Sequence, residues 1–288
     1  MSDVHHAVLT DSIASFSRRL AQTKARKIAE LLFRYYPVKR GVTTIHDFDG
    51  DLSILLDRAS YISSAIYWAG HHSLPLVRFL RRFLKPEMTL ADVGANIGEI
   101  TLFAGKKLTQ GRVLAFEPMP GVFSELALTV ALNHFASSVE LFNVGLFDRD
   151  GSLPLYVKED QPFGTTNKGV TSIFSTGRDR QVTTVPLRRF DDIAEERRLE
   201  RLDVMKLDVE GAEWMVLRGA ENSIKRFRPV IIVEISASTY GRAGYSPRDL
   251  FNYFESLAYD LRNLEDGSTK LPSECDALCV PREMKAAF

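Results

Sequence analysis

From Met88 onward, short apolar segments alternate with segments of helical periodicity. The apolar segments have the length of buried strands, and they span residues 89–93, 112–116, 139–144, 203–207 and 230–235. Between most of them, apolar residues recur at three- and four-residue spacing, over residues 100–108, 122–132 and 213–227. Parallel strands need long crossover connections, which such helices supply. The alternation therefore predicts an α/β fold with a mostly parallel sheet, which weaker strands at 259–263 and 276–280 would close.

The residues before this alternation follow other patterns. Residues 12–36 combine apolar side chains at helical spacing with basic ones, and Pro37 ends this predicted helix. We expect it to pack on the protein, and binding to a membrane surface or a partner is the alternative. A hairpin around Asp49-Gly50-Asp51 and a further helix are predicted next, over residues 43–48, 52–56 and 75–84. The chain is thus predicted to divide into an N-terminal helix and hairpin extension, 1–85, and a main domain, 86–288.

Composition excludes several classes of protein. Hydrophobic residues make up 45% of the 288 residues, which is enough for a sizeable core, and 37 basic residues balance 37 acidic ones. A neutral chain has no general attraction for nucleic acid or anionic lipid. Cys275 and Cys279 are too few for a disulfide scaffold and are predicted to be reduced thiols. The first ten residues lack a signal-peptide pattern, and the longest uncharged stretch, 59–77, is too polar to span a bilayer. We therefore expect a cytoplasmic protein.

A glycine loop follows the first strand of the main domain. It reads Asp92-Val93-Gly94-Ala95-Asn96-Ile97-Gly98 and opens a predicted helix. Gly94 and Gly98 allow sharp turns and close approach to a ligand, and a helix N-terminus presents free N–H groups. The loop therefore predicts a cradle for a nucleoside. A nicotinamide dinucleotide is disfavoured, because the dinucleotide fingerprint has glycine where this chain has Asn96.

An acidic residue ends the next predicted strand. Glu117 follows Asp92 by about 25 residues, the spacing at which a βαβ fold places a carboxylate beside ribose hydroxyls. Alone, Glu117 would be interpreted as a solvated strand end. Together with the glycine loop, it predicts a ribose contact.

Further carboxylates follow the later strands, at the sheet edge where α/β proteins bind ligands. Asp208, Glu210 and Glu213 lie where a strand gives way to a helix, and helix capping is the alternative role for Asp208 and Glu213. Glu234 follows the very apolar segment 230–233, where a carboxylate is costly unless it is paired or hydrated. We therefore predict that Asp208, Glu210 and Glu234 take part in chemistry.

Other polar residues are weaker candidates. His71 and His72 are adjacent, so their side chains point in different directions, and no third histidine lies nearby. His134 is interpreted as a cap or a surface residue. The polar segment 161–177 is too long for a tight turn and is predicted to be a lid or a mobile surface loop.

These residues together resemble the FkbM-type family of S-adenosyl-L-methionine-dependent methyltransferases. The likeness covers about residues 88–254, and its most specific part is Lys206-Leu207-Asp208-Val209-Glu210-Gly211-Ala212-Glu213. The glycine loop, Phe116-Glu117-Pro118 and Val233-Glu234 accompany it. The resemblance implies a class I methyltransferase (Rossmann-like) fold, with a seven-stranded sheet whose last strand is inserted antiparallel. It also implies methyl transfer to a hydroxyl of a sugar, a polyketide or a similar natural product.

The resemblance also implies roles for particular residues. Those expected to bind S-adenosyl-L-methionine are Asp92, Gly94, Asn96, Gly98, Glu117, Asn143 and Gly145. Asp208 and Glu210 would face the transferred methyl group. One departure from the family pattern is His71-His72 after Gly70, where an acidic residue is expected.

The implied reaction is an in-line displacement in which an acceptor oxygen attacks the methyl carbon of a sulfonium. A base near the acceptor hydroxyl assists such a step, and Asp208 is the predicted base, with Glu210 or Glu234 assisting. The same oxygens are able to hold Mg²⁺, which we do not expect. The acceptor would be a small molecule or a glycan, and nucleic acid is disfavoured.

Two other functions stay open on the sequence alone, besides the disfavoured nicotinamide oxidoreductase. One is ribose 2′-O-methylation of RNA or a nucleotide, with Lys206, Asp208 and Glu234 in the site. Against it stand the neutral charge and the lack of a basic stripe interleaved with aromatic residues. The other is a cofactor-binding interaction module without catalysis. The acceptor's identity is not readable from the sequence, and a homo-oligomer is also open.

Overall fold

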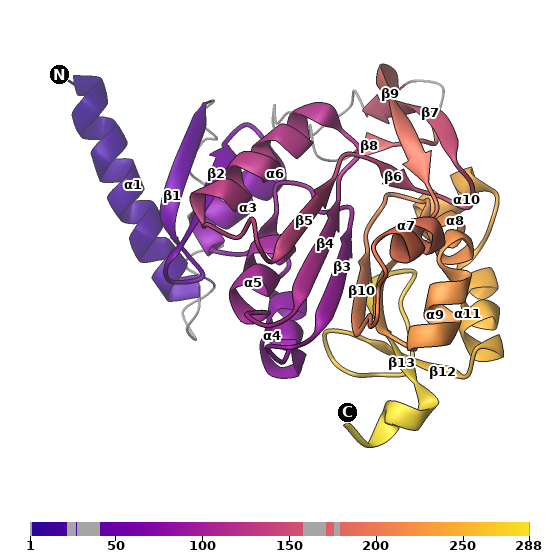
Figure 1. Ribbon diagram of the computed structural model, residues 1–288. Helices are drawn as coiled ribbons and strands as arrows, with labels where there is room; N and C mark the ends of the chain where they lie inside the picture. Colours follow the sequence, from indigo (N-terminus) through magenta and orange to yellow (C-terminus); the bar gives the residue numbers. More distant parts are fainter. Residues whose placement is uncertain (1, 22–26, 28–40, 158–170, 176–178, 288) are drawn as a thin grey trace.

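The computed structural model describes residues 2–21, 27, 41–157, 171–175 and 179–287, and its centre is a seven-stranded sheet (Figure 1). The strand order is β12-β13-β11-β10-β3-β4-β5. Neighbouring strands are parallel, except that β13 runs antiparallel to β11 and β12. The predicted sheet of seven strands with an antiparallel insertion is therefore confirmed. The strands are β3 (Thr89–Val93), β4 (Arg112–Phe116), β5 (Val139–Phe142), β10 (Val204–Leu207), β11 (Val230–Ser236), β12 (Tyr259–Asn263) and β13 (Glu274–Pro281).

Helices cover both faces of this sheet. Side chains of a strand point alternately to the two faces, and in β3 both sets are apolar. Leu90 packs into the core on one face, and Ala91 and Val93 pack into the core on the other. The first face is covered by α4 (Leu74–Phe83), α5 (Glu99–Lys107) and α6 (Pro120–Leu132). The second is covered by α7 (Phe190–Glu196), α8 (Glu213–Gly219), α9 (Glu221–Phe227), α10 (Ala237–Ala243) and α11 (Pro247–Ser256). Both faces are apolar, which explains the nearly continuous apolar strands of the sequence.

Before β3, the described residues form a helix, a hairpin and two further helices. Figure 1 shows α1 (Ser2–Ala21) beside β1 (Val42–Phe48) and β2 (Leu52–Asp57), and α3 (Tyr61–Ala69) leads into α4. Arg18 of α1 donates to the Tyr67 carbonyl of α3 at 2.6 Å and pairs with Asp47 of β1. The predicted hairpin is confirmed. The predicted helix 12–36 begins earlier, at Ser2, and most of residues 22–40 lie outside the described part.

Apolar side chains before and after residue 85 share one core. Phe48 and Leu80 belong to the same buried cluster as Phe103 of α5. The division into an extension, 1–85, and a main domain, 86–288, stays a prediction.

A second, four-stranded sheet is inserted between β5 and β10, and the sequence did not predict it. Its order is β6-β9-β7-β8, and Figure 1 shows it beyond one end of the large sheet. Its strands are short or half-exposed, so their apolar pattern is weak. They span Gly145–Leu146 (β6), Gly151–Val157 (β7), Thr171–Ser172 (β8) and Arg180–Arg188 (β9). Of the predicted lid 161–177, the structure describes residues 171–175.

The predicted helix over residues 213–227 is two helices, α8 and α9, which meet at Ala220. A Cβ atom on Gly219 would lie 2.0 Å from the Phe147 carbonyl oxygen, so the chain touches the inserted sheet here. Apolar periodicity continues across the break because both helices bury residues on the same core, which is why the sequence pattern missed it. Among the described residues, no helix combines the length and the apolar character that crossing a membrane requires.

Candidate functional site

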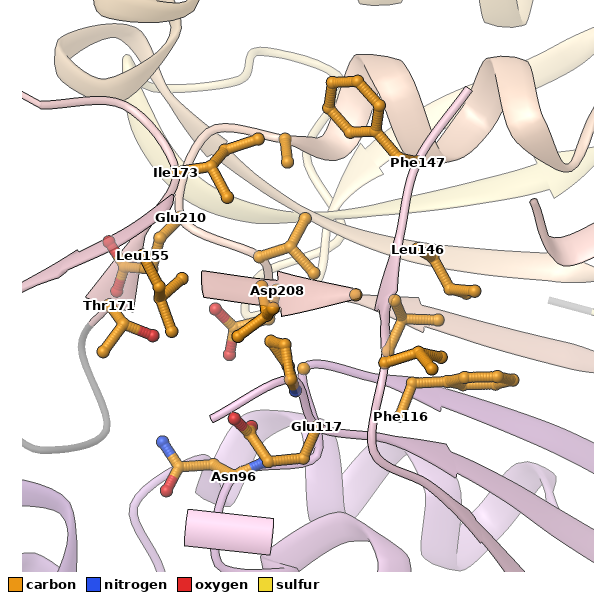
Figure 2. Close-up of a pocket in the computed structure, with 18 of the residues that line it drawn as sticks. Asn96, Phe116, Glu117, Leu146, Phe147, Leu155, Thr171, Ile173, Asp208 and Glu210 are labelled. Atoms are coloured by element: carbon orange, nitrogen blue, oxygen red, sulfur yellow. The ribbon is translucent and has the colours of Figure 1, made fainter. Parts of the chain in front are cut away.

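A cavity of about 300 Å³ lies at the carboxyl ends of β3, β4, β10 and β11. The inserted sheet and α3 supply its other walls. Figure 2 shows Asn96 and Glu117 together on one side, with Asp208 between them and the apolar side chains of Ile173 and Phe147. The cavity is lined by the predicted site residues Gly94, Asn96, Glu117, Gly145, Asp208, Glu210 and Glu234. The other predicted site residues, Asp92, Gly98 and Asn143, do not line it.

The turn from β3 into α5 forms the floor of the cavity. Gly94 has φ +77°, and a Cβ atom there would lie 1.9 Å from the Asp208 carbonyl oxygen. Gly98 has φ +97°, and its Cβ position is 2.7 Å from Leu126. Both glycines thus allow close packing within the protein, where the sequence alone predicted close approach to a ligand. Asn96 also has positive φ, at +52°, and lines the cavity.

Glu117 ends β4 beside this turn and is only 6% exposed. Its two carboxylate oxygens each accept one backbone hydrogen bond, from Asn96 N at 3.0 Å and Met119 N at 2.9 Å. Burial raises the pKa of Glu117 to about 7, although these hydrogen bonds and Lys206 oppose the rise. A carboxylate has about four acceptor positions, so two remain for O–H donors in the cavity.

Asn143 and Gly145 shape the adjacent wall. The Asn143 amide donates to the carbonyl oxygens of Glu117 and Pro118, at 2.8 and 3.2 Å. It therefore holds the chain that carries Glu117 and does not line the cavity, and its expected contact with adenine stays a prediction. Gly145 does line the cavity, and a Cβ atom there would lie 2.9 Å from Leu187 of β9.

A buried lysine, Lys206, contacts both the end of β3 and Asp208 after β10. From the sequence alone, it has a role only in the alternative of RNA ribose methylation. Lys206 is 7% exposed and donates to the Gly94 carbonyl at 2.6 Å. Its ammonium lies 3.3 Å from Asp92 and 3.5 Å from Asp208. Burial lowers the pKa of Lys206, but these two carboxylates outweigh it and hold the pKa above its ordinary value.

Asp92 is one of the two partners of this lysine. Its side chain is fully buried, and one oxygen accepts a hydrogen bond from Thr101 at 2.6 Å. Asp92 is thus linked to the glycine loop through Lys206, and its predicted contact with the cofactor stays a prediction.

Asp208, Glu210 and Glu234 meet at one edge of the cavity. Asp208 is half exposed, and Glu210 has positive φ, at +53°, with its carbonyl held by Ser172 of the inserted sheet at 2.8 Å. Glu234 lies within β11, not after its end, and pairs across the sheet with Asp276 of β13. Burial, with Asp208 and Glu210 nearby, raises the pKa of Glu234 to about 9. Burial and the neighbouring carboxylates therefore favour the protonated form of Glu234.

Glu213 does not line the cavity but holds the segment that carries Asp208 and Glu210. Its buried carboxylate accepts from Val209 N at 3.0 Å and Gly211 N at 3.4 Å, and from the Tyr245 hydroxyl at 3.1 Å. Burial raises the pKa of Glu213 to about 7. Glu213 thus binds backbone N–H groups at the start of α8, as the capping alternative predicted.

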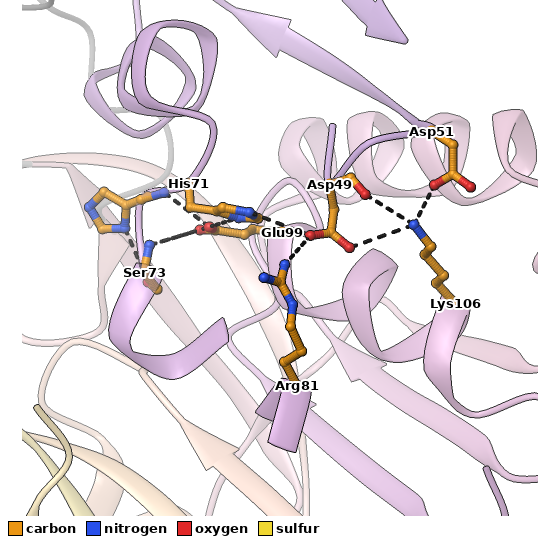
Figure 3. A network of polar contacts seen from close by, with 8 residues as sticks. Asp49, Asp51, His71, Ser73, Arg81, Glu99 and Lys106 are labelled. Atoms are coloured by element: carbon orange, nitrogen blue, oxygen red, sulfur yellow. Dashed lines mark hydrogen bonds and ion pairs between the residues drawn. The ribbon is translucent and has the colours of Figure 1, made fainter. Parts of the chain in front are cut away.

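The two adjacent histidines have separate environments. His72 lines the cavity, whereas His71 is buried with its imidazole 3.3 Å from Glu99 and 3.7 Å from Asp49. Figure 3 shows this network continuing from Asp49 to Arg81 and Lys106. It ties the hairpin turn to α4 and α5. Although burial alone would lower it, the pKa of His71 is raised to about 9 by Asp49 and Glu99.

This network predicts that stability falls at alkaline pH. Because the folded-state pKa of His71 exceeds its ordinary value, its contribution is fully present below about pH 6.5 and is lost as pH rises through about 9. We expect the free energy of unfolding, measured in urea, to lose about 3 kcal/mol over this interval. His71→Gln should remove the loss, and His46→Gln, a change on the exposed hairpin, should retain it. An equal loss in His71→Gln would contradict the assignment.

The cavity residues fit a nucleoside. A buried carboxylate with unused acceptor positions suits two ribose hydroxyls, and Gly94 and Gly145 line the cavity beside it. For a metal ion, the described residues contain no suitable group of three or more His, Cys, Asp or Glu side chains.

Comparisons with known proteins show which proteins this chain is similar to. The family model described as the methyltransferase FkbM domain matches residues 92–261. Methyltransferase sdnD of Sordaria araneosa is 30% identical over 182 residues, covering 55% of this chain and 69% of sdnD. Hexuronic acid methyltransferase AglP of Haloferax volcanii is 29% identical over 175 residues, covering 61% of this chain and 64% of AglP.

Two further matches carry the FkbM name. The 31-O-demethyl-FK506 methyltransferase FkbM of Streptomyces tacrolimicus is 28% identical over 164 residues, covering 49% of this chain and 62% of that protein. The crystal structure of methyltransferase FkbM from Methylobacillus flagellatus has a TM-score of 0.46 at 19% identity, covering 68% of this chain and 44% of that one. Because the family model matches more than half of the chain, this protein belongs to the FkbM family of S-adenosylmethionine-dependent methyltransferases.

Proposed function

We propose that the protein transfers the methyl group of S-adenosylmethionine to a hydroxyl of a sugar, a polyketide or a similar natural product. The observation that carries the proposal is that Glu117, which suits a ribose, and Asp208, which suits a reacting hydroxyl, line one cavity. Two relatives supply further support, because AglP is named as a methyltransferase of hexuronic acid and FkbM as a methyltransferase of 31-O-demethyl-FK506.

In this proposal the cofactor's nucleoside lies across the floor of the cavity. Glu117 accepts hydrogen bonds from the two ribose hydroxyls, and its backbone bonds to Asn96 and Met119 hold the carboxylate for them. Gly94, Asn96 and Gly145 form the surrounding wall. The bound cofactor supplies a methyl group on a positively charged sulfur.

The chain's own residues then prepare the acceptor. The acceptor hydroxyl donates its proton to the Asp208 carboxylate while its oxygen forms a bond to the methyl carbon and the carbon–sulfur bond breaks. Glu234, whose pKa is raised by burial, serves as a hydrogen-bond donor at the same edge, and Glu210 is a further carboxylate there. The sulfur keeps the bonding electron pair, so charge and atoms balance.

The first test removes the ribose contact. Glu117→Ala should weaken S-adenosylmethionine binding in isothermal titration by roughly 10- to 100-fold, because two hydrogen bonds to a charged group are lost. Glu255→Ala, an exposed change on α11, is the control and should bind like the wild type. An unchanged affinity in Glu117→Ala would contradict the ribose assignment.

The second test concerns the acceptor. Full-length protein with labelled S-adenosylmethionine is offered methyl glycosides, alkyl and aryl alcohols, and a structured RNA. Methylation of a hydroxyl of the small molecules is expected. Transfer to the RNA alone would favour ribose 2′-O-methylation, and binding without transfer to any acceptor would favour an interaction module.

A further inference from the structure

We propose that His72 contacts the methyl acceptor, so that the segment before the family-matched region completes the acceptor side of the site. This inference rests on the proposed function, because it assigns a further residue to the same cavity. His72 lies in the turn between α3 and α4, whereas the family match begins at residue 92.

The imidazole of His72 is exposed at the cavity wall and is available to a ligand. It lines the cavity together with Tyr61 and Ile62 of α3. The Tyr61 ring packs edge-on against it, with the ring centroids 6.0 Å apart, and Nδ1 lies 3.3 Å from the Ser73 hydroxyl oxygen. Among the described residues, the other ring nitrogen, Nε2, has no hydrogen-bond partner. Two contacts thus restrict the ring and leave one polar atom for a ligand.

The backbone of His72 is held to the cofactor-binding half of the cavity. Its N–H donates to the buried Glu99 carboxylate at 3.0 Å, and the Ser73 N–H donates to the same carboxylate at 3.2 Å. Glu99 follows Gly98 directly and begins α5. The turn that presents His72 is therefore placed relative to the glycine loop by a buried ionic group, which His71 and Asp49 stabilise in turn (Figure 3).

His72 also faces the charges that surround the proposed base. Asp276 of β13 interacts electrostatically with Asp208, with Lys206 and with His72. Asp208 and His72 both line this cavity. A hydroxyl-bearing acceptor that donates its proton to Asp208 is thus within the region where His72 offers a hydrogen bond.

The adjacent His71 does not compete for this role. It is 6% exposed, and both sides of its ring face carboxylates of the network. Successive residues present their side chains in different directions, so one histidine fixes the turn while the next reaches the cavity.

The test uses His72→Ala and His72→Gln in the full chain, with the best acceptor from the panel above. For His72→Ala we expect kcat/KM for the acceptor to fall roughly 10- to 100-fold, mainly through a higher KM, because one hydrogen bond to the acceptor is lost. The affinity for S-adenosylmethionine should stay within about twofold. His72→Gln, which keeps a hydrogen-bonding amide, should recover part of the loss. His46→Ala, on the exposed side of the hairpin, is the control for removing a histidine.

Three results would overturn the inference. Unchanged acceptor kinetics in His72→Ala would show that the ring does not contact the acceptor. A parallel loss of S-adenosylmethionine affinity would assign the ring to the cofactor, and a lower unfolding temperature in both variants with equal losses would assign it to structure. A failure of the proposed function is seen separately, because the wild type itself would then methylate no hydroxyl in the panel.

Discussion

Asp208→Asn lowers kcat for methyl transfer by roughly 10²- to 10⁴-fold in our expectation, the usual contribution of a positioned base. An amide keeps the shape of the side chain but cannot take the acceptor's proton. The affinity for S-adenosylmethionine should remain nearly unchanged, because the proposed ribose contact of Glu117 is left intact. Steady-state kinetics and isothermal titration together measure the two effects.

The control for this experiment is Asp51→Asn. Asp51 lies on the hairpin turn, its side chain is 72% exposed, and it pairs with Lys106 away from the cavity. It should leave both kcat and cofactor affinity as in the wild type. Normal turnover in Asp208→Asn would remove Asp208 as the base and direct attention to Glu210.

Lys206→Met should destabilise the protein by about 3–5 kcal/mol in urea unfolding, the cost of leaving a buried carboxylate without its partner. Methionine is similar in length, so the effect isolates the charge. Asp92 is fully buried and would keep only its hydrogen bond from Thr101. Since the Gly94 carbonyl also loses its donor, cofactor affinity should fall as well.

A double variant separates charge from packing. In Lys206→Met with Asp92→Asn, the unpaired charge is gone, so more than half of the lost stability should return. Lys225→Met, which breaks an exposed pair with Glu221, should change stability by less than about 0.5 kcal/mol. If the double variant is no more stable than Lys206→Met, the loss arises from packing and the charge assignment is wrong.

Much of the large sheet was predictable because its strands are buried on both faces and are therefore apolar throughout. Strands β3, β4 and β12 begin and end where the sequence predicts them, and β10 differs by one residue. The inserted sheet was missed because residues such as Thr184 and Pro186 expose one face of its strands to solvent, which leaves no continuous apolar signal. Phe147 and Leu187 therefore line the cavity although no sequence motif predicts them there.

The candidate site divides in the same way. Glu117, Asp208 and Glu210 were found because each follows a recognisable strand, and strand ends of a parallel sheet meet at one edge. The spacing could not distinguish Glu117, which faces the cavity, from Asp92, which turns toward Lys206. His72 was only a weak candidate, because no local pattern distinguishes it from His71.

The sequence by itself determined the order of the large sheet's strands along the chain, the turn at Gly94 and the family to which the chain belongs, because these depend on local periodicity and on short motifs. Only the tertiary structure decided which polar side chains face the cavity and which bind other groups inside the protein. That choice depends on contacts between residues far apart in the chain, such as Lys206 with Asp92 and Glu99 with the turn at His72. Burial then sets the charge of each group, and burial exists only once the elements have packed together.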